Sequence, residues 1–371
     1  MDHLVMNTMK KSLLLLLLAL FLLPAPGFAQ KASELKWTDA QNLMLINQGY
    51  DNTELPYSRL PLDMKAATRK AVWDLGLNSA GLAVRFSTDS RSIGIRWTLL
   101  NYFIMHHMAG TGIRGIDLYQ LDENDHWQFI GTAIPNGKDT TKTQVVVSGM
   151  DGKDHEYMAY LPLYDGVTKV EIGVTKDARV GLPHREVLVK GKDKPLVFYG
   201  TSITQGGCAS RPGMVYTSII SRALQKECIN LGFSGNARMD KSMAEIVARV
   251  DADQYVIDCL ENCTLKVMQD SAWYFLTYLA KKRPDAPIYM VEHIWFSHAL
   301  VNQPVHDQIT EKNAYWREIY EKLRKEGYDN FRYIPADKLT GPDGEGAVDG
   351  CHQTDLGFLR MSEEFLRHLK R

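Results

Sequence analysis

Residues 195–207 read PLVFYGTSITQGG, an apolar run that changes abruptly into glycine, hydroxyl and amide side chains. The apolar residues 195–199 predict a buried strand, and the glycines that follow predict a tight turn into a helix. Ser202 lies in this turn, and turns supported by a rigid sheet are common positions for catalytic groups. The stretch therefore predicts a strand-turn-helix unit with a reactive hydroxyl at its turn.

The same alternation continues through the C-terminal half of the chain. Strand-like apolar runs occupy residues 195–199, 228–233, 254–260, 287–292 and 330–334. Helical stretches separate them, and residues 306–326 show the clearest apolar spacing of three and four residues. This order predicts a parallel sheet with helices on both faces. The carboxyl ends of its strands then share one edge, where open sheets of this type bind ligands.

Residues 78–190 have a different pattern, in which short segments alternate apolar and polar residues. The segments include 82–86, 92–97, 143–147 and 169–174, and Asn-Gly or Asp-Gly turns follow at 136–137, 151–152 and 165–166. Period-two alternation with such turns predicts an antiparallel β-sandwich of jelly-roll-like type. Residues 34–77, rich in Trp, Tyr and Pro, are expected to form an extended lead-in packed on this sandwich.

The N-terminus has the features of a secretory signal peptide. Lys10 and Lys11 precede an apolar run at 13–23, and the segment PAPGFA at 24–29 follows with a predicted cleavage after Ala29. The run is shorter than the roughly 20 residues that span a bilayer, which disfavours a membrane anchor. We therefore expect a periplasmic or secreted protein with no membrane insertion after cleavage. The predicted parts are a signal peptide at 1–29, a sandwich domain at 30–190 and a catalytic domain at 195–371.

Composition restricts the classes of partner and cofactor. The net charge of −1 gives no reason to expect nucleic acid as a partner. The cysteines number five, so at least one thiol is unpaired within the monomer, and we expect them to be small buried side chains. Cys259 and Cys263 have no second cysteine pair or nearby histidine pair to complete a metal site. The sequence therefore predicts neither a metal nor a cofactor.

Polar clusters follow the first three predicted strands and precede the last helix. They are 200–202, 232–236, 261–263 and 349–352. Together the clusters contain a serine, backbone N–H donors, a side-chain amide, a carboxylate and an imidazole. This is the set of groups that acyl transfer requires.

Each of these groups has a predicted role. Ser202 is the predicted nucleophile and His352 its base, because an imidazole ordinarily titrates near neutral pH. Asp349 lies three residues before His352, so a single loop can hold the carboxylate against the ring. The backbone N–H groups of Ser202 and Gly235 and the side-chain amide of Asn262 are expected to stabilise the negative oxygen of the tetrahedral intermediate.

The segments GTSITQGG, NLGFSGNA, LENC and DGCHQTDLGF resemble the ordered blocks of the SGNH hydrolases, the GDSL esterase superfamily. The resemblance covers residues 195–371. It implies a flavodoxin-like three-layer α/β/α domain with Ser202, Gly235, Asn262 and His352 as its named residues and Asp349 as the triad acid. The sandwich is similar to the N-terminal domain of a subset of these enzymes in polysaccharide-degrading bacteria, many of them acetyl xylan esterases.

The sequence departs from the family pattern at three places. Thr201 replaces the usual acidic residue before the serine, residues 260–263 replace Gly-x-Asn-Asp, and Gln353 replaces a proline. None of these changes removes a triad or oxyanion group, so they bear on the substrate more than on the chemistry. Thr204 interrupts a Gly-x-Ser-x-Gly pattern, which argues against the lipase-type α/β-hydrolase fold.

The first functional hypothesis is a metal-independent serine esterase that removes acetyl or another small acyl group from a carbohydrate. The alternatives are an inactive carbohydrate-binding protein and a lipase or thioesterase of the same fold. His293 and Trp295, near the end of the fourth strand, are expected to contact the substrate. Exposed aromatic rings can stack on sugars, although core packing is the other interpretation for Trp295 and Tyr102. His106 and His107 lie in the predicted sandwich near Tyr102, where a contact over the active-site edge is one interpretation, and a structural role is the favoured one.

Overall fold

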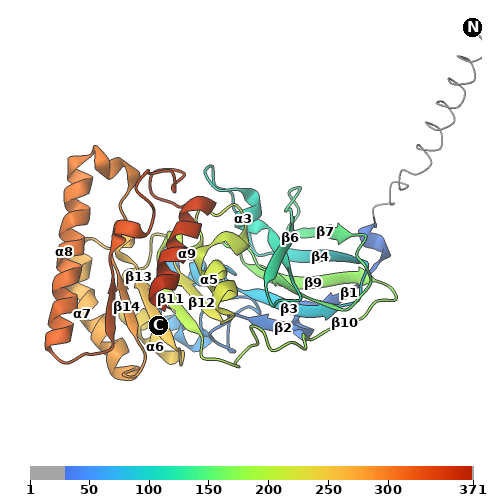
Figure 1. The fold of residues 1–371 in the computed structure, drawn as a ribbon, viewed down its shortest axis with the longest axis horizontal. Coiled ribbons are helices and arrows are strands. Elements are labelled where there is room, and N and C mark those ends of the chain that lie inside the picture. Colours follow the sequence, from blue (N-terminus) through green and yellow to red (C-terminus); the bar gives the residue numbers. More distant parts are fainter. Residues whose placement is uncertain (1–29, 370–371) are drawn as a thin grey trace, which may run out of the picture.

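The structure is a computed structural model that describes residues 30–369. An antiparallel sandwich lies beside a layered α/β domain, as Figure 1 shows. The predicted signal peptide at 1–29 lies outside the described residues. Within residues 30–369, no helix is both long and apolar enough to cross a membrane.

The C-terminal domain is built on a five-stranded parallel sheet with the order β12-β11-β13-β14-β15. The strands are β11 (Leu196–Gly200), β12 (Cys228–Gly232), β13 (Gln254–Asp258), β14 (Ile288–Val291) and β15 (Phe331–Ile334). Counted along the chain this order is 2-1-3-4-5, the flavodoxin-like arrangement. The order reverses between β11 and β13, and ligands bind at the carboxyl edge of such a reversal. The predicted fold class is confirmed.

Helices cover both faces of this sheet because alternate residues of each strand point to opposite sides. Leu196 and Phe198 of β11 face one layer, and Val197 and Tyr199 face the other. The first layer contains α5 (Tyr216–Leu224) and α9 (Asp355–Leu369). The second contains α6 (Lys241–Arg249), α7 (Leu265–Lys282) and α8 (Gln303–Lys325), which includes most of the helix predicted at 306–326.

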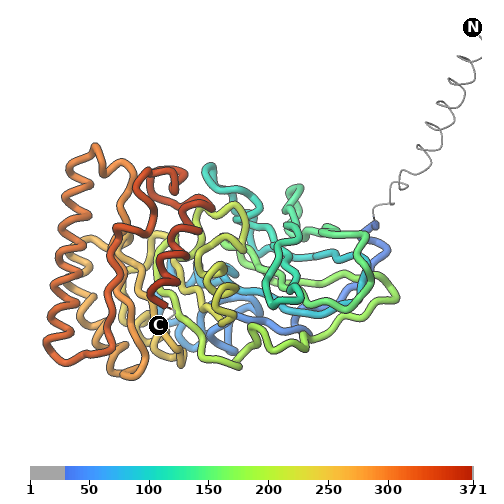
Figure 2. The backbone as a smooth tube through the Cα atoms, viewed as in Figure 1, coloured from blue at the N-terminus to red at the C-terminus, as the bar shows by residue number. Residues whose placement is uncertain are grey.

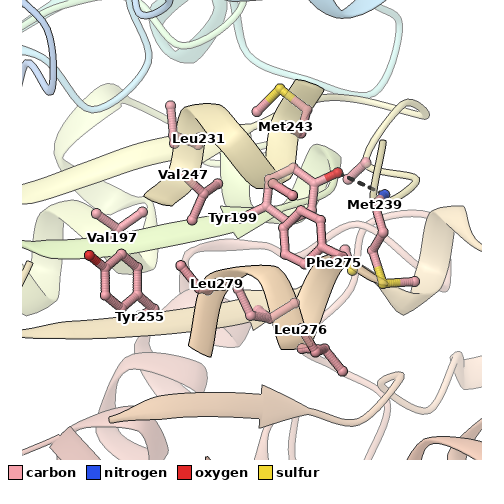
Figure 3. Close-up of a cluster of buried hydrophobic side chains, with 14 of the residues drawn as sticks. Val197, Tyr199, Leu231, Met239, Met243, Val247, Tyr255, Phe275, Leu276 and Leu279 are labelled. Carbon is pink, nitrogen blue, oxygen red and sulfur yellow. Dashed lines mark hydrogen bonds between the residues drawn. The ribbon is translucent and has the colours of Figure 1, made fainter. Parts of the chain in front are cut away.

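Figure 3 shows the second layer around Tyr199. The Tyr199 ring stacks on Phe275 with a centroid separation of 5.0 Å, and its hydroxyl accepts a hydrogen bond from the Met239 N–H at 3.0 Å. The buried phenol thus satisfies its polar atom while its ring remains in the apolar core. This contact fixes β11, the strand that leads to Ser202.

The N-terminal half contains two antiparallel sheets, one with the order β1-β9-β4-β7 and one with β10-β3-β8-β5-β6, where β2 also pairs with β3. Their bounds are β1 Leu35–Asp39, β2 Met44–Ile46, β3 Ala83–Thr88, β4 Ser92–Leu99, β5 Ile116–Leu121, β6 Trp127–Ala133, β7 Thr141–Ser148, β8 His155–Tyr160, β9 Val167–Thr175 and β10 Val180–Gly181. Val84 and Phe86 from one sheet share a core with Ile95 and Ile172 from the other. The predicted antiparallel sandwich is confirmed.

The first part of the lead-in at 34–77 packs on the sandwich as predicted. β1 and β2 join the sandwich, but most of residues 50–76, which end with α2 (Lys70–Gly76), pack on the C-terminal domain, while Tyr57 enters the sandwich core. Tyr50 and Trp73 share a core with Leu231 of β12. The reason is that β12 is an edge strand, and covering an edge protects its backbone groups from pairing with another chain.

Hydrogen bonds from the lead-in complete the edge of β12. The side-chain oxygen of Asn47 accepts the Cys228 N–H at 3.0 Å. The Arg59 guanidinium is 2% exposed and donates to four backbone carbonyls, those of Leu75, Asn78, Asn230 and Gly232. Burial lowers the pKa of Arg59 to about 9, so the group remains a cation at neutral pH. Arg59 therefore ties the lead-in to the strand that precedes the Gly235 turn.

A second buried contact joins the two domains directly. Asp117, on β5 of the sandwich, is fully buried and accepts hydrogen bonds from the Arg211 guanidinium and the Gly213 N–H, both at 2.8 Å. Burial raises the pKa of Asp117, and the charge of Arg211 opposes that rise. The Asp117 carboxylate thus has partners from the C-terminal domain, as a buried charge requires.

Replacing Arg59 with methionine keeps the length of the side chain and removes all its donors. We expect the free energy of unfolding to fall by about 3 kcal/mol or more, because several buried carbonyls lose a charged donor. Urea denaturation followed by tryptophan fluorescence measures this change. The control is Arg179→Met, which removes an exposed ion pair with Asp89 and should leave the unfolding midpoint close to that of the wild type. Equal midpoints for the two variants would contradict the role of Arg59.

Candidate active site

Ser202 begins the four-residue helix α4 (Ser202–Gln205), directly beyond β11. This helix lies against the strand ends because two glycines leave room for it. A Cβ atom on Gly200 would lie 1.9 Å from Thr204 Oγ1, and one on Gly232 would lie 2.1 Å from the Gln205 nitrogen. The glycines of the sequence are thus required by the close approach of α4, which places Ser202 at the carboxyl edge of the sheet.

The structure brings the three predicted triad residues together. The Ser202 Oγ lies 2.9 Å from His352 Nε2, and His352 Nδ1 lies 2.7 Å from Asp349 Oδ2. Because a carboxylate only accepts, Nδ1 carries the proton and Nε2 accepts the hydrogen bond from the serine hydroxyl. This is the arrangement in which an imidazole can remove the serine proton.

The loop that carries His352 also holds Asp349 in its ionised form. The backbone N–H groups of His352 and Cys351 donate to Asp349 Oδ1 at 2.7 Å and 3.0 Å, and Gly350 turns the chain between them with φ of 84°. Partial burial acts to raise the pKa of Asp349, but the hydrogen bonds from the His352 ring and these N–H groups outweigh it and lower the pKa to about 2. The carboxylate is therefore charged at neutral pH.

The predicted oxyanion donors lie on neighbouring loops at the same edge of the sheet. The Ser202 N–H is at the first position of α4 and has no acceptor within that helix. Gly235 has φ of 68°, no atom lies within 4 Å of where its Cβ would be, and its N–H bonds to no other described residue. Asn262 accepts the Ala237 N–H through Oδ1 at 3.3 Å, which leaves its NH₂ group available as a donor.

The sandwich domain also contributes to the active site through hydrogen bonds with helix α4. The Tyr164 hydroxyl donates to the Ser202 carbonyl oxygen at 3.1 Å, and the Gln205 side-chain NH₂ donates to the Leu163 carbonyl at 3.1 Å. A Cβ on Gly206 would lie 2.7 Å from the Leu163 side chain. Helix α4 is therefore held between the sheet and the sandwich. No spacing in the sequence indicates this contact, because its partners lie about 40 residues apart in different domains.

His107 lies beside the triad, which corrects its interpretation as a structural residue. Its Nε2 is 3.9 Å from Asp349 Oδ2, and its ring centroid is 5.6 Å from that of His352. The loop at 100–109 that carries it extends from the sandwich and lies next to the His352 loop (Figure 2). Asp165 anchors this loop by accepting the N–H groups of Asn101 and Phe103. The one available signal was the histidine pair at 106–107 in a loop with few other polar residues.

His293 does not face the site, which corrects the expectation that it contacts substrate. Its side chain is 1% exposed, and its Nδ1 donates to the Ile294 carbonyl at 2.6 Å. Burial, with the nearby charge of Lys312, lowers the pKa of His293 to about 3, so the ring is neutral. Asn313 on α8 bonds both the N–H and the carbonyl of His293. His293 therefore stabilises the end of β14 within the protein.

Trp295, the other predicted substrate contact, is half-buried and lines a cavity of about 420 Å³. Its ring lies 5.2 Å from that of His306. Phe296, Asp337 and Gln353 also line this cavity, whereas neither Ser202 nor His352 does. The cavity borders the base of the His352 loop, so Trp295 lies near the reacting groups without reaching them.

The departures from the family pattern have local structural explanations. The Thr201 hydroxyl accepts the Ile203 N–H at 3.2 Å and caps α4, a task that suits threonine as well as an acidic residue. Glu261 is buried and accepts the Ile294 N–H at 3.0 Å, so it links the Asn262 loop to the end of β14. Burial raises the pKa of Glu261. These residues support the site and leave its reacting groups intact.

Two family models match the sequence. Residues 193–370 match the GDSL-like lipase/acylhydrolase family, and residues 35–180 match a model of the N-terminus of SGNH-hydrolase-type esterases. No curated protein matches the sequence.

Several solved structures resemble this chain. A candidate GDSL-like lipase from Bacteroides ovatus is 34% identical, with a TM-score of 0.85 over 91% of this chain and 97% of the other. A salicylyl-acyltransferase from a tetracycline biosynthetic pathway is 14% identical, with a TM-score of 0.69 over 92% and 98%. An acetyl xylan esterase from the rumen bacterium Butyrivibrio proteoclasticus is 13% identical, with a TM-score of 0.52 over 91% and 98%. The two more distant structures show a shared fold alone.

Asn262→Ala removes one oxyanion donor and leaves the backbone donors in place. We expect kcat for an activated ester to fall by about 10²–10³, because the amide stabilises the transition state more than the bound substrate. Steady-state kinetics with p-nitrophenyl acetate measures the change, and the matched control is Asn136→Ala at an exposed turn of the sandwich. A kcat within about twofold of the wild type would exclude Asn262 from the oxyanion hole.

The pH dependence follows from the low pKa of Asp349. This carboxylate loses its charge only as the pH falls towards its depressed pKa of about 2, so it does not titrate between pH 4 and 9. We expect any acid limb of log kcat/KM in this interval to have a limiting slope no greater than one, because Asp349 contributes no ionisation there. A limiting slope of two would contradict the ionised state assigned to Asp349.

Proposed function

Because the chain belongs to the GDSL-like lipase/acylhydrolase family, we propose that it is an exported serine esterase that removes acetyl or another small acyl group from a carbohydrate. The observation that carries the esterase mechanism is the continuous hydrogen-bonded chain from Ser202 through His352 to Asp349. An intact chain of this kind favours catalysis over the alternative of an inactive carbohydrate-binding protein.

The acylation half-reaction uses the groups in their observed positions. Ser202 Oγ attacks the ester carbonyl as its proton moves to His352 Nε2, and a tetrahedral intermediate forms. The donors of Ser202, Gly235 and Asn262 stabilise the negative oxygen, while Asp349 stabilises the imidazolium. The ester bond then breaks, and His352 gives its proton to the departing alcohol oxygen of the sugar.

The second half-reaction repeats the same proton transfers with water. A water molecule loses a proton to His352 Nε2 as its oxygen attacks the acyl-serine carbonyl. The bond to Ser202 Oγ breaks, the serine regains its proton from His352, and the carboxylic acid leaves. None of these steps requires a group outside the triad, the oxyanion donors and water.

The carbohydrate part of the proposal has support from the surroundings of the site. The cavity beside the His352 loop combines the aromatic rings of Trp295 and Phe296 with the polar groups of His306 and Asp337. Its volume of about 420 Å³ is in the range of small-molecule sites, and aromatic faces with nearby polar groups suit sugar rings. The predicted signal peptide is consistent with a substrate outside the cytoplasm.

Acetate release tests this proposal. Mature protein should release acetate from p-nitrophenyl acetate and from acetylated xylan, and Ser202→Ala should reduce both rates by at least about 10³, because the nucleophile is lost. The matched control, Ser148→Ala at the exposed end of β7, should retain wild-type rates.

The alternatives give distinct results in the same assay. Turnover of long-chain esters or thioesters with no release from acetylated polysaccharides would replace the carbohydrate proposal by a lipase or thioesterase. Glycan binding that Ser202→Ala leaves unchanged, without turnover of any ester, would show the inactive binding protein instead.

A further inference from the structure

Three side chains that can bind a metal ion meet beside the catalytic serine. They are the imidazoles of His107 and His352 and the thiol of Cys208, and their ligand atoms lie within 4.8 Å of one another. All five cysteines lie in the described part of the chain and all are free, so this thiol is not engaged in a disulfide. The triad mechanism uses only His352 of the three.

Separate structural elements hold these ligands in place. The loop at 100–109 brings His107 from the sandwich, and the neighbouring Met108 is buried in the core of the C-terminal domain. Cys208 follows α4, and its N–H donates to the Gln353 carbonyl at 3.4 Å, next to His352. Both contacts fix the backbone near its ligand, so the cluster does not depend on a flexible tail or terminus.

We infer that His107, Cys208 and His352 form an inhibitory site for a borderline divalent cation such as Zn²⁺. Two imidazole nitrogens and a thiolate are the ligands that Zn²⁺ favours, whereas Mg²⁺ and Ca²⁺ require mainly oxygen ligands. A water molecule would supply the fourth position. The ion is an inhibitor of this site and takes no part in the proposed esterase reaction.

The three ligand atoms need to move only slightly closer together to bind the ion. Tetrahedral Zn²⁺ with bonds of about 2.0–2.3 Å separates its ligand atoms by roughly 3.5 Å. The present separations of up to 4.8 Å therefore require movements of about 1 Å. The His107 side chain is 39% exposed and has room to rotate. The charge of Asp349, whose Oδ2 lies 3.9 Å from His107 Nε2, also favours a cation here.

Inhibition follows from the atom that the ion occupies. His352 Nε2 has a single lone pair, which accepts the Ser202 proton during catalysis. When this lone pair binds the cation, the imidazole cannot act as a base. The Cys208 thiol loses its proton to water as the Sγ–metal bond forms, and removal of the ion by a chelator restores both groups.

Direct binding is measured on Ser202→Ala, so that this test is independent of the proposed esterase function. Calorimetric titration with Zn²⁺ should show one site per chain. Co²⁺ should give a thiolate-to-metal charge-transfer band and the visible spectrum of a tetrahedral site. Adding Cys208→Ser should abolish the charge-transfer band, whereas the matched control Cys351→Ser should retain it. No stoichiometric Zn²⁺ binding, or a band that survives Cys208→Ser, overturns the inference.

A second experiment measures inhibition of ester hydrolysis by Zn²⁺ and compares variants of the neighbouring histidines His106 and His107. Zn²⁺ should inhibit hydrolysis of p-nitrophenyl acetate by the wild type, and EDTA should reverse the inhibition. His107→Ala should raise the half-inhibitory Zn²⁺ concentration by roughly tenfold or more, since a ligand is lost, and His106→Ala should leave it unchanged. Equal inhibition of His107→Ala and wild type overturns the inference. A protein that shows the Co²⁺ spectrum but has no esterase activity would support the metal site and refute the proposed function.

Discussion

The position of helix α4 is the constraint on which the active site depends. On one side, Gly200 and Gly232 allow the helix to lie against the ends of β11 and β12. On the other side, Leu163 and Tyr164 of the sandwich contact the helix and the Ser202 carbonyl. A hydrogen bond such as the 2.9 Å contact between Ser202 and His352 tolerates only a few tenths of an ångström of displacement. The position of Ser202 relative to His352 therefore depends on contacts from both domains.

The contacts between the two halves of the chain explain how that accuracy is achieved. Arg59 and Asp117 are buried charges, and each bonds to groups from the other half of the chain. Removing one of these contacts while the halves stay packed would leave a buried charge short of partners, which is costly. The sandwich is in this sense part of the catalytic apparatus. It also supplies His107, which reaches the triad from a loop anchored by Asp165.

Features that arise from local sequence patterns were predicted correctly. Predictions were wrong for residues whose positions depend on packing between distant segments. The strands, the antiparallel sandwich and the Asp349-x-x-His352 loop have local signals of period, turn type or spacing, and the structure places them as expected. His293 follows a strand at the expected edge, but the packing of α8 buries it. His107 and residues 50–76 differ from expectation because no periodicity shows that a segment of one domain covers another.

The central claim is that Ser202 is an activated nucleophile held by contacts from both domains. The most direct measurement is covalent labelling with a fluorophosphonate, which reacts with activated serines, followed by peptide mapping by mass spectrometry. We expect stoichiometric modification of Ser202 in the folded protein and loss of labelling in His352→Ala and after unfolding. Modification of another serine, or an unreactive Ser202 in the folded protein, would contradict it.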